Sequence, residues 1–225
     1  MKTKILIMLA AGTFSFAACC HSMEPTRDNL RPALQKYLRE KGDLCLGKFD
    51  WPIDVSEHDR KIGTRDALQM PVLEKIGIVI SSKGSAKRMA GGSEKIVPVT
   101  RYKLTKTGKK FYLARETIQV SADGKKTVHR GDFCAGKLSL DSIVGLDAPQ
   151  TVGDHQEATV AYTYKFAAAD WTRNPEIRKV FPMVDRIVNG AGTMQLKQLF
   201  RLTKSGWVAV NPWDDLGKNE TRPLS

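Results

Sequence analysis

Two cysteines, Cys45 and Cys134, are the residues of this chain best placed to do chemistry. They occupy equivalent positions in two Gly-Asp-x-Cys-x-Gly-Lys segments, at 42–48 and 131–137. Neither belongs to a C-x-x-C pair, and no histidine lies at metal-ligand spacing from either, so the sequence indicates neither a redox dithiol nor a zinc site. A disulfide between them is expected in an oxidising compartment. A Cys–His nucleophile pair is the alternative, and a disulfide would exclude it.

Other catalytic and cofactor motifs are missing from the sequence. Lys-Thr-Gly at 106–108 and Lys-Ser-Gly at 204–206 resemble the K-T-G motif of penicillin-binding proteins and β-lactamases. No serine has a lysine three positions later, however, so the nucleophile motif of those enzymes is absent. No phosphate-binding loop or H-E-x-x-H motif occurs, and the four histidines are scattered in the manner of exposed loop residues. We therefore predict no cofactor, no metal site and no enzymatic activity; the alternative is a hydrolase whose site the sequence does not reveal.

A basic segment between two apolar stretches is a candidate binding site. Residues 81–95 are rich in Ser, Gly and Lys and show no periodicity, which predicts a long mobile loop. Its cations can meet an anionic surface, and the alternative is a solvated loop without a partner. The candidate partner-binding or anion-binding residues are Lys83, Lys87, Arg88 and Lys95.

The first eighteen residues have the composition of an export signal. Two lysines precede an apolar stretch at 5–16, which is too short to cross a bilayer as a helix. The Phe-Ala-Ala-Cys segment at 16–19 resembles the lipobox of bacterial lipoprotein precursors, in which the cysteine is lipidated and becomes the mature N-terminus. The resemblance implies a lipid on Cys19. Because Cys20 follows it, the resemblance also implies the outer membrane of a Gram-negative host; a soluble periplasmic protein is the alternative.

The exported part of the chain is strongly basic. Without the two lysines of the signal segment, 34 basic residues remain against 24 acidic ones. This balance favours anionic partners such as phospholipid headgroups, lipopolysaccharide or acidic proteins, although charge can also serve solubility alone. Export argues against nucleic acid as a partner. No other apolar run is long enough to span a membrane.

Three short segments recur in the same order in both halves of the chain. The matching ranges are 42–48 with 131–137, 70–76 with 181–187, and 102–108 with 200–206. One match would be chance, but three in order suggest duplication of a strand–helix–hairpin unit. Independent recurrence of a favourable turn sequence is the alternative. If the two units pair with pseudo-twofold symmetry, a bond between the equivalent cysteines places their two strands side by side.

The elements that position these residues predict an α+β fold with antiparallel sheet. Apolar residues at helical spacing predict a helix over 25–42, started by Asp28 or Asn29, and strict alternation predicts a strand over 157–167. Further expected elements are a helix over 65–76 broken or restarted at Pro71, a hairpin turning at 105–108, a turn at Asp123-Gly124, a helix opened by Asn174-Pro175 and kinked at Pro182, and a final hairpin over 192–212.

One stretch resembles the helix and wing of winged-helix domains. The resemblance lies in the sequence LEKIGIV at 73–79 and in the hairpin-like sequence at 101–112. It implies a fold element and a binding surface. It does not imply DNA binding by an exported protein.

These observations predict an exported, lipid-anchored cell-envelope protein that acts by binding. It would be an envelope or surface-assembly factor, or a periplasmic immunity or inhibitor protein; a periplasmic hydrolase is the alternative. The expected organisation is a signal peptide at 1–18, a tether and helix at 19–41, two related α+β units at 42–120 and 121–213, and a polar tail at 214–225.

Overall fold

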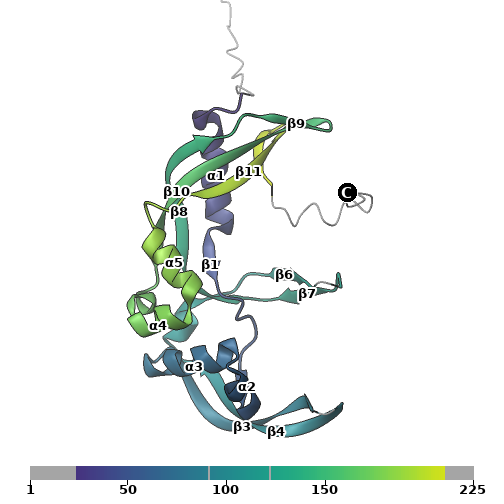
Figure 1. Cartoon of the computed structure of the whole chain (residues 1–225), viewed down its shortest axis with the longest axis vertical. Coiled ribbons are helices and arrows are strands. Elements are labelled where there is room, and N and C mark those ends of the chain that lie inside the picture. Colours follow the sequence, from purple (N-terminus) through teal and green to yellow (C-terminus); the bar gives the residue numbers. More distant parts are fainter. Residues whose placement is uncertain (1–23, 91, 122, 211–225) are drawn as a thin grey trace, which may run out of the picture.

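The structure of this chain is a computed structural model, and it describes residues 24–90, 92–121 and 123–210. The fold is α+β with mostly antiparallel sheets, which confirms the predicted class. The molecule is elongated, with a long N-terminal helix and a larger sheet at one end and a smaller sheet at the other (Figure 1).

The larger sheet has the strand order β1-β8-β10-β11-β12 in the described part of the chain, with β5 beside β8 and β9 beside β10. The strand expected at 157–167 is the central β10, and the expected final hairpin is β11–β12. The bounds are β1 (Asp43–Cys45), β5 (Tyr112–Leu113), β8 (Asp132–Leu146), β9 (Gln150–Val152), β10 (His155–Ala168), β11 (Leu196–Thr203) and β12 (Gly206–Ala209).

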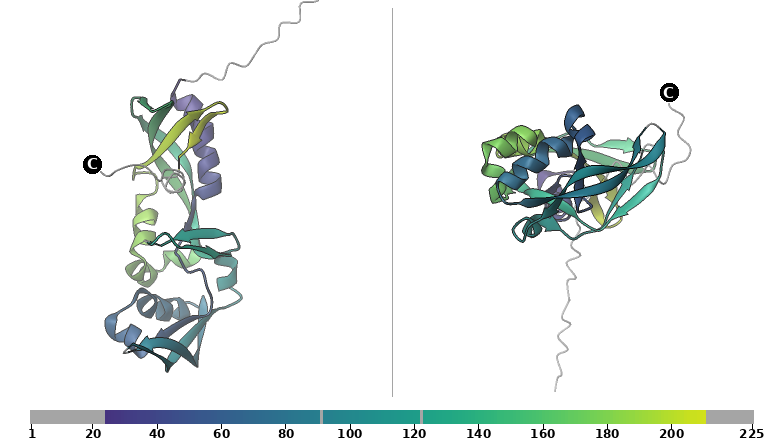
Figure 2. Two further views of the ribbon diagram at one scale, coloured as in Figure 1. Left: turned by 90° about the vertical axis from the view of Figure 1, so that its right-hand side faces the viewer. Right: turned by 90° about the horizontal axis from the view of Figure 1, so that it is seen from below.

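Helix α1 (Arg27–Lys41) lies along one face of this sheet (Figure 2) and confirms the helix expected there. Its apolar residues recur every four positions, so they share one face of the helix. Thr26 caps the start, where its hydroxyl accepts the Asn29 N–H at 3.2 Å, so the expectation of Asp28 or Asn29 as the cap was wrong. The buried side chains of this face are Leu30, Leu34 and Leu38, which pack with Val160, Tyr164 and Phe200.

The smaller sheet has the strand order β2-β4-β3, and two helices connect β2 to β3. Helix α3 runs through Pro71 without a break, which corrects the expectation of a break there. Ser56 and Asp59 form a capping box that starts the shorter helix. The bounds are β2 (Ile53–Ser56), α2 (Glu57–Ile62), α3 (Arg65–Lys75), β3 (Val79–Ala90) and β4 (Ser93–Leu104).

Helices from the C-terminal half complete the core beside the smaller sheet. The ring of Phe133 stacks on Trp171 at 5.1 Å, and Ile177 and Val184 are fully buried in the same cluster as Leu73 of α3. Asn174 caps the helix that begins at Pro175, as predicted, and a new helix begins at Pro182. The elements between the two sheets are η1 (Gly108–Phe111), β6 (Thr117–Val120), β7 (Lys126–His129), η2 (Asp170–Arg173), α4 (Pro175–Val180) and α5 (Pro182–Gly190).

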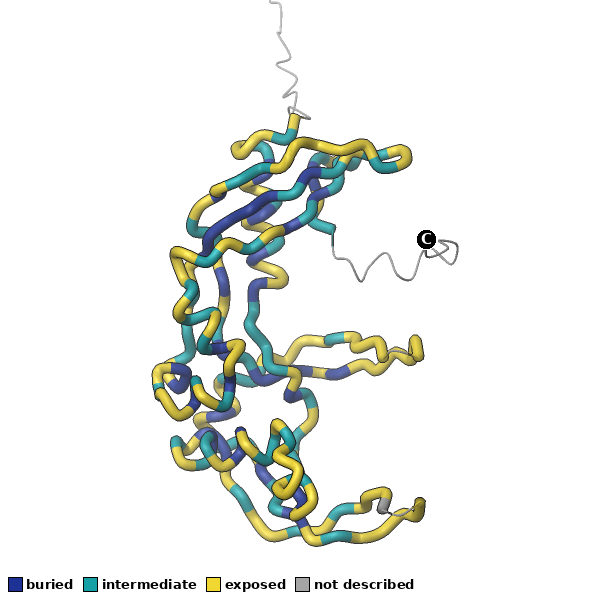
Figure 3. The backbone as a smooth tube through the Cα atoms, in the orientation of Figure 1, coloured by how far each residue is buried: buried dark blue, intermediate teal, exposed yellow. Residues whose placement is uncertain are grey.

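The prediction of a mobile loop at 81–95 was wrong. These residues belong to the β3–β4 hairpin, whose register runs from Val79↔Leu104 to Ala90↔Ser93. The outer half of this hairpin is exposed on both faces (Figure 3), so it lacks the apolar–polar alternation by which a half-buried strand is recognised. We call residues 83–96 of this hairpin the basic arm.

The expectation of a hairpin with its turn at 105–108 was also wrong. Strand β4 pairs with the preceding β3 and then leads into the 3₁₀ helix η1. Thr105 explains the difference: its hydroxyl donates to the Gly77 carbonyl at 2.7 Å, and its N–H donates to Ile78 at 3.0 Å. Gly108 packs so closely that a Cβ there would lie 2.1 Å from the Ile78 carbonyl oxygen. The matching segment at 200–206 does form a hairpin turn, between β11 and β12.

Candidate functional site

The disulfide between Cys45 and Cys134 is present, as predicted, with a sulfur–sulfur distance of 2.09 Å. Strands β1 and β8 pair antiparallel, with Asp43 opposite Lys137 and Cys45 opposite Cys134. The two Gly-Asp-x-Cys-x-Gly-Lys segments therefore lie side by side, as their equivalence suggested. We call this crossing the disulfide neck, because the bond joins two residues 89 positions apart, and the whole smaller sheet lies in the loop between them.

A buried carboxylate fixes the loop that leaves the disulfide neck. Asp132 is 8% exposed, and it accepts the N–H of Gly47 at 3.0 Å and of Lys48 at 2.7 Å. Desolvation raises the pKa of Asp132, although these N–H groups act in the opposite direction. The buried side chain of Lys48 forms an ion pair with Asp66 of α3, so the same loop is tied to the smaller-sheet end.

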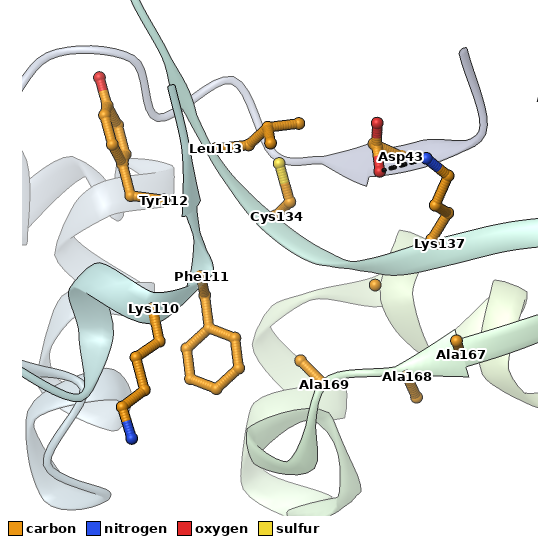
Figure 4. A pocket seen from close by; sticks show the side chains of 11 residues that line it. Asp43, Lys110, Phe111, Tyr112, Leu113, Cys134, Lys137, Ala167, Ala168 and Ala169 are labelled. Atoms are coloured by element: carbon orange, nitrogen blue, oxygen red, sulfur yellow. Dashed lines mark ion pairs between the residues drawn. The ribbon is translucent and has the colours of Figure 1, made fainter. Parts of the chain in front are cut away.

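A pocket of about 320 Å³ lies beside the disulfide neck. Its wall is apolar, formed by the ring of Phe111, by Leu113 and by the alanines at 167–169 (Figure 4). On one side Lys137 lies 3.6 Å from Asp43, which also pairs with an arginine of the β5–β6 connection, so one carboxylate lies between two cations. The sulfur of Cys134 lines the pocket but belongs to the disulfide, so it offers no thiolate. The pocket is open to solvent, and its lining combines apolar side chains with Asp43, Lys110 and Lys137.

The four predicted anion-binding residues all lie on the basic arm and are exposed. The structure places them on two faces of the hairpin rather than in one patch, because side chains alternate along a strand. Lys83 and Lys87 share one face, and Lys87 lies 3.0 Å from Glu94. Arg88 and Lys95 lie directly opposite each other on the other face. The guanidinium of Arg88 turns back toward β2, whereas Lys95 is exposed.

An ion pair holds the base of the basic arm against β2. Arg101 donates to both carboxylate oxygens of Asp54, at 2.7 Å each, and this bond holds the pKa of Asp54 below its usual value. Arg88 reaches back to the backbone carbonyl of Asp54 at 3.4 Å. The base of the arm is therefore fixed, while its outer half extends into solvent.

Sequence reasoning missed the pocket and misjudged one histidine. The pocket lining comes from separate segments that carry no shared motif, although Asp43 and Lys137 belong to the repeated segment. His129 is 9% exposed rather than an exposed loop residue. Its ring stacks on Phe49 at 4.0 Å and lies 3.3 Å from the Asp50 carboxylate, so it fixes the base of the β6–β7 hairpin.

The predicted lipidation site Cys19, the signal segment and the polar tail lie outside the described residues. Within the described ranges no helix is both long enough and apolar enough to cross a membrane. Comparison with known proteins gave no matching family model, curated protein or solved structure.

Proposed function

We propose that this chain is an exported cell-envelope protein that binds an anionic envelope component through the basic arm. The observation that carries the proposal is the cross-strand pair of Arg88 and Lys95 on an exposed hairpin that also holds Lys83 and Lys87. This hairpin carries four exposed cations between 83 and 96 against the single acidic residue Glu94, and this excess of positive charge favours an anion-binding role. The disulfide supports export, because such bonds persist in oxidising compartments.

Charge reversal tests this role. Lys83→Glu, Lys87→Glu and Arg88→Glu together should leave thermal stability almost unchanged, because these side chains are exposed. The same variant should bind membrane fragments of the host envelope more weakly, and the difference from wild type should shrink as salt screens the charges. Arg31→Glu, Lys36→Glu and Lys179→Glu form a control with the same change in net charge on other exposed surfaces. Equal binding by the two variants would refute the role of the basic arm.

We propose that a lipid on Cys19 anchors the protein to the outer membrane, facing the periplasm. The proposal rests on the lipobox resemblance at 16–19. Cys19→Ser should abolish fatty-acid labelling and release the protein into the soluble periplasmic fraction. A wild-type protein that is unlabelled and soluble would contradict this anchoring and favour simple secretion.

We further propose that residues 53–104 form a winged-helix-like module in which β3–β4 is the wing. Support comes from the strand order β2-β4-β3 and from the two helices that precede the hairpin. Duplication of an ancestral unit is a related hypothesis, which the antiparallel pairing of the two repeated strands supports. The other two repeated segments argue against it. The segment 70–76 ends α3, whereas 181–187 spans the start of α5, and 102–108 leads into η1, whereas 200–206 forms the turn between β11 and β12.

A further inference from the structure

Five exposed large apolar side chains of the described residues gather on two hairpins, and the proposed binding role does not yet explain them; others of similar exposure, such as Ile62 and Met183, lie on separate helices. Met89 and Ile96 on the basic arm are 72% and 73% exposed. Ile118, Val120 and Val128 on the β6–β7 hairpin are 61%, 55% and 57% exposed. Large apolar side chains gathered on a protruding element indicate an interaction surface.

The β6–β7 hairpin, which we call the short arm, presents these residues on one face. Ile118 lies opposite Val128, and Val120 follows two positions later, so the three share a face. The other face holds Gln119 and His129, and His129 packs on the body of the molecule. The apolar face is therefore turned to solvent. No third strand pairs with this hairpin in the described part of the chain.

The basic arm combines apolar and cationic side chains in the same way. Lys87 lies opposite Ile96, and Met89 lies opposite Glu94, so Lys87, Met89 and Ile96 share one face near the end of the hairpin. On the short arm, Lys126 lies directly opposite Val120, Lys125 precedes it, and Asp123 is the one acidic residue between 119 and 128. Both arms therefore carry apolar side chains among an excess of cations.

Both arms project from the same side of the elongated molecule (Figures 1 and 3). A single extended surface can thus contact both of them. A flat partner with a negatively charged surface and an apolar interior would bind both the cationic and the apolar side chains.

We propose that the two arms dock on an anionic phospholipid bilayer, with the five apolar side chains entering the interface and the neighbouring cations meeting the headgroups. A second copy of the chain is a poorer occupant, because two like-charged arms would repel one another across such a contact. Aliphatic side chains among lysines and arginines are the combination that binds anionic lipid surfaces.

This inference rests on the proposed anion-binding role, and the test separates the two. The protein with Cys19→Ser is mixed with vesicles of phosphatidylglycerol and phosphatidylethanolamine, or of phosphatidylcholine alone, and bound protein is measured by sedimentation. The apolar variant carries Met89→Gln, Ile96→Thr, Ile118→Thr, Val120→Thr and Val128→Thr. A control variant carries Met183→Gln and Val208→Thr, which alter exposed apolar residues elsewhere.

Wild type should bind the anionic vesicles and not the phosphatidylcholine vesicles, and part of its binding should persist at high salt because aliphatic insertion is not screened. The apolar variant should bind at least about tenfold more weakly and lose the salt-resistant part, while the control variant binds as wild type. Wild-type affinity in the apolar variant would overturn the inference and leave the anion-binding role intact. Absence of wild-type binding to anionic vesicles would also overturn the inference. The charge-reversal experiment on membrane fragments would then test the anion-binding role by itself.

Discussion

Removing the disulfide tests how strongly the disulfide neck holds the fold together. The perturbation is the double variant Cys45→Ala and Cys134→Ala, which leaves no thiol of this pair to bond with another cysteine. The bond closes a loop with a sequence separation of 89 residues. In the chain-entropy model, opening a loop of this length lowers the free energy of unfolding by about 4–5 kcal/mol. Such a loss is a large fraction of the stability of an ordinary domain.

Guanidinium denaturation followed by tryptophan fluorescence measures this loss, because Trp171 lies in the core and reports its exposure. The double variant should unfold at a lower denaturant concentration and with a steeper dependence on denaturant, since its unfolded chain exposes more surface. A reductant should shift the wild-type curve toward that of the variant and leave the variant unchanged. A loss below about 1 kcal/mol would refute the loop-closure reasoning. It would show that the β1–β8 pairing and the contacts of Asp132 hold the disulfide neck without the bond.

Two further substitutions test the buried charges beside the disulfide neck. Asp132→Asn should lower the free energy of unfolding by about 1–3 kcal/mol, because an amide offers one acceptor oxygen to the two N–H groups that the carboxylate satisfies. Burial raises the pKa of Asp132, so the stability that this shift contributes is present at low pH and is lost as the pH rises through the folded-state pKa. Denaturation measured from pH 4 to 7 should therefore show a shrinking difference in unfolding free energy between wild type and Asp132→Asn. A constant difference would contradict this reasoning. Asp66→Asn should lower the free energy of unfolding by about 1–3 kcal/mol, because it leaves the buried Lys48 ammonium without its charged partner. Lys48→Met should change the free energy of unfolding by less than about 1 kcal/mol. Equal losses in the two variants would refute this account of the ion pair.

The parts of the fold that the sequence predicted well are those where one face is buried. Helix α1 was recognised because Leu30, Leu34 and Leu38 recur at helical spacing, and all three are buried against the larger sheet. Strand β10 was recognised because the large residues Val160, Tyr162 and Tyr164 alternate with smaller ones, although the middle of this strand is buried on both faces. The basic arm was missed because neither face of its outer half packs on the core, so no pattern distinguishes it from a loop.

Only the part of the candidate site that lies in the two repeated segments could be predicted from the sequence. Equivalence of Cys45 and Cys134 was enough to propose their bond and the adjacency of their strands. The pocket could not be predicted, because Phe111 and the alanines at 167–169 come together only through the packing of η1 against the end of β10. The apolar face of the short arm needs the register of Ile118 with Val128, which a sequence alone doesn't provide.

The disulfide neck and the short arm are physically connected, and this connection bears on how the arm can work. An isolated two-stranded hairpin is marginally stable in water, so the short arm needs support at its base. Asp132 fixes the loop at Gly47 and Lys48, and the next residue, Phe49, stacks on His129 at the base of the arm. The hydroxyl of Tyr112 donates to the Phe49 carbonyl at 2.7 Å, which holds the same loop from the side of β5.

This chain of contacts runs from the buried carboxylate to the outer hairpin without passing through a flexible segment of the described residues. The base of the short arm therefore packs on the loop at 46–50 through the contact of Phe49 with His129. A surface that binds by several weak contacts gains from such pre-organisation, because the entropy of orienting the arm is lost on folding rather than on binding. The buried carboxylate of Asp132 thus supports the loop on which the base of the short arm packs, and burial raises its pKa.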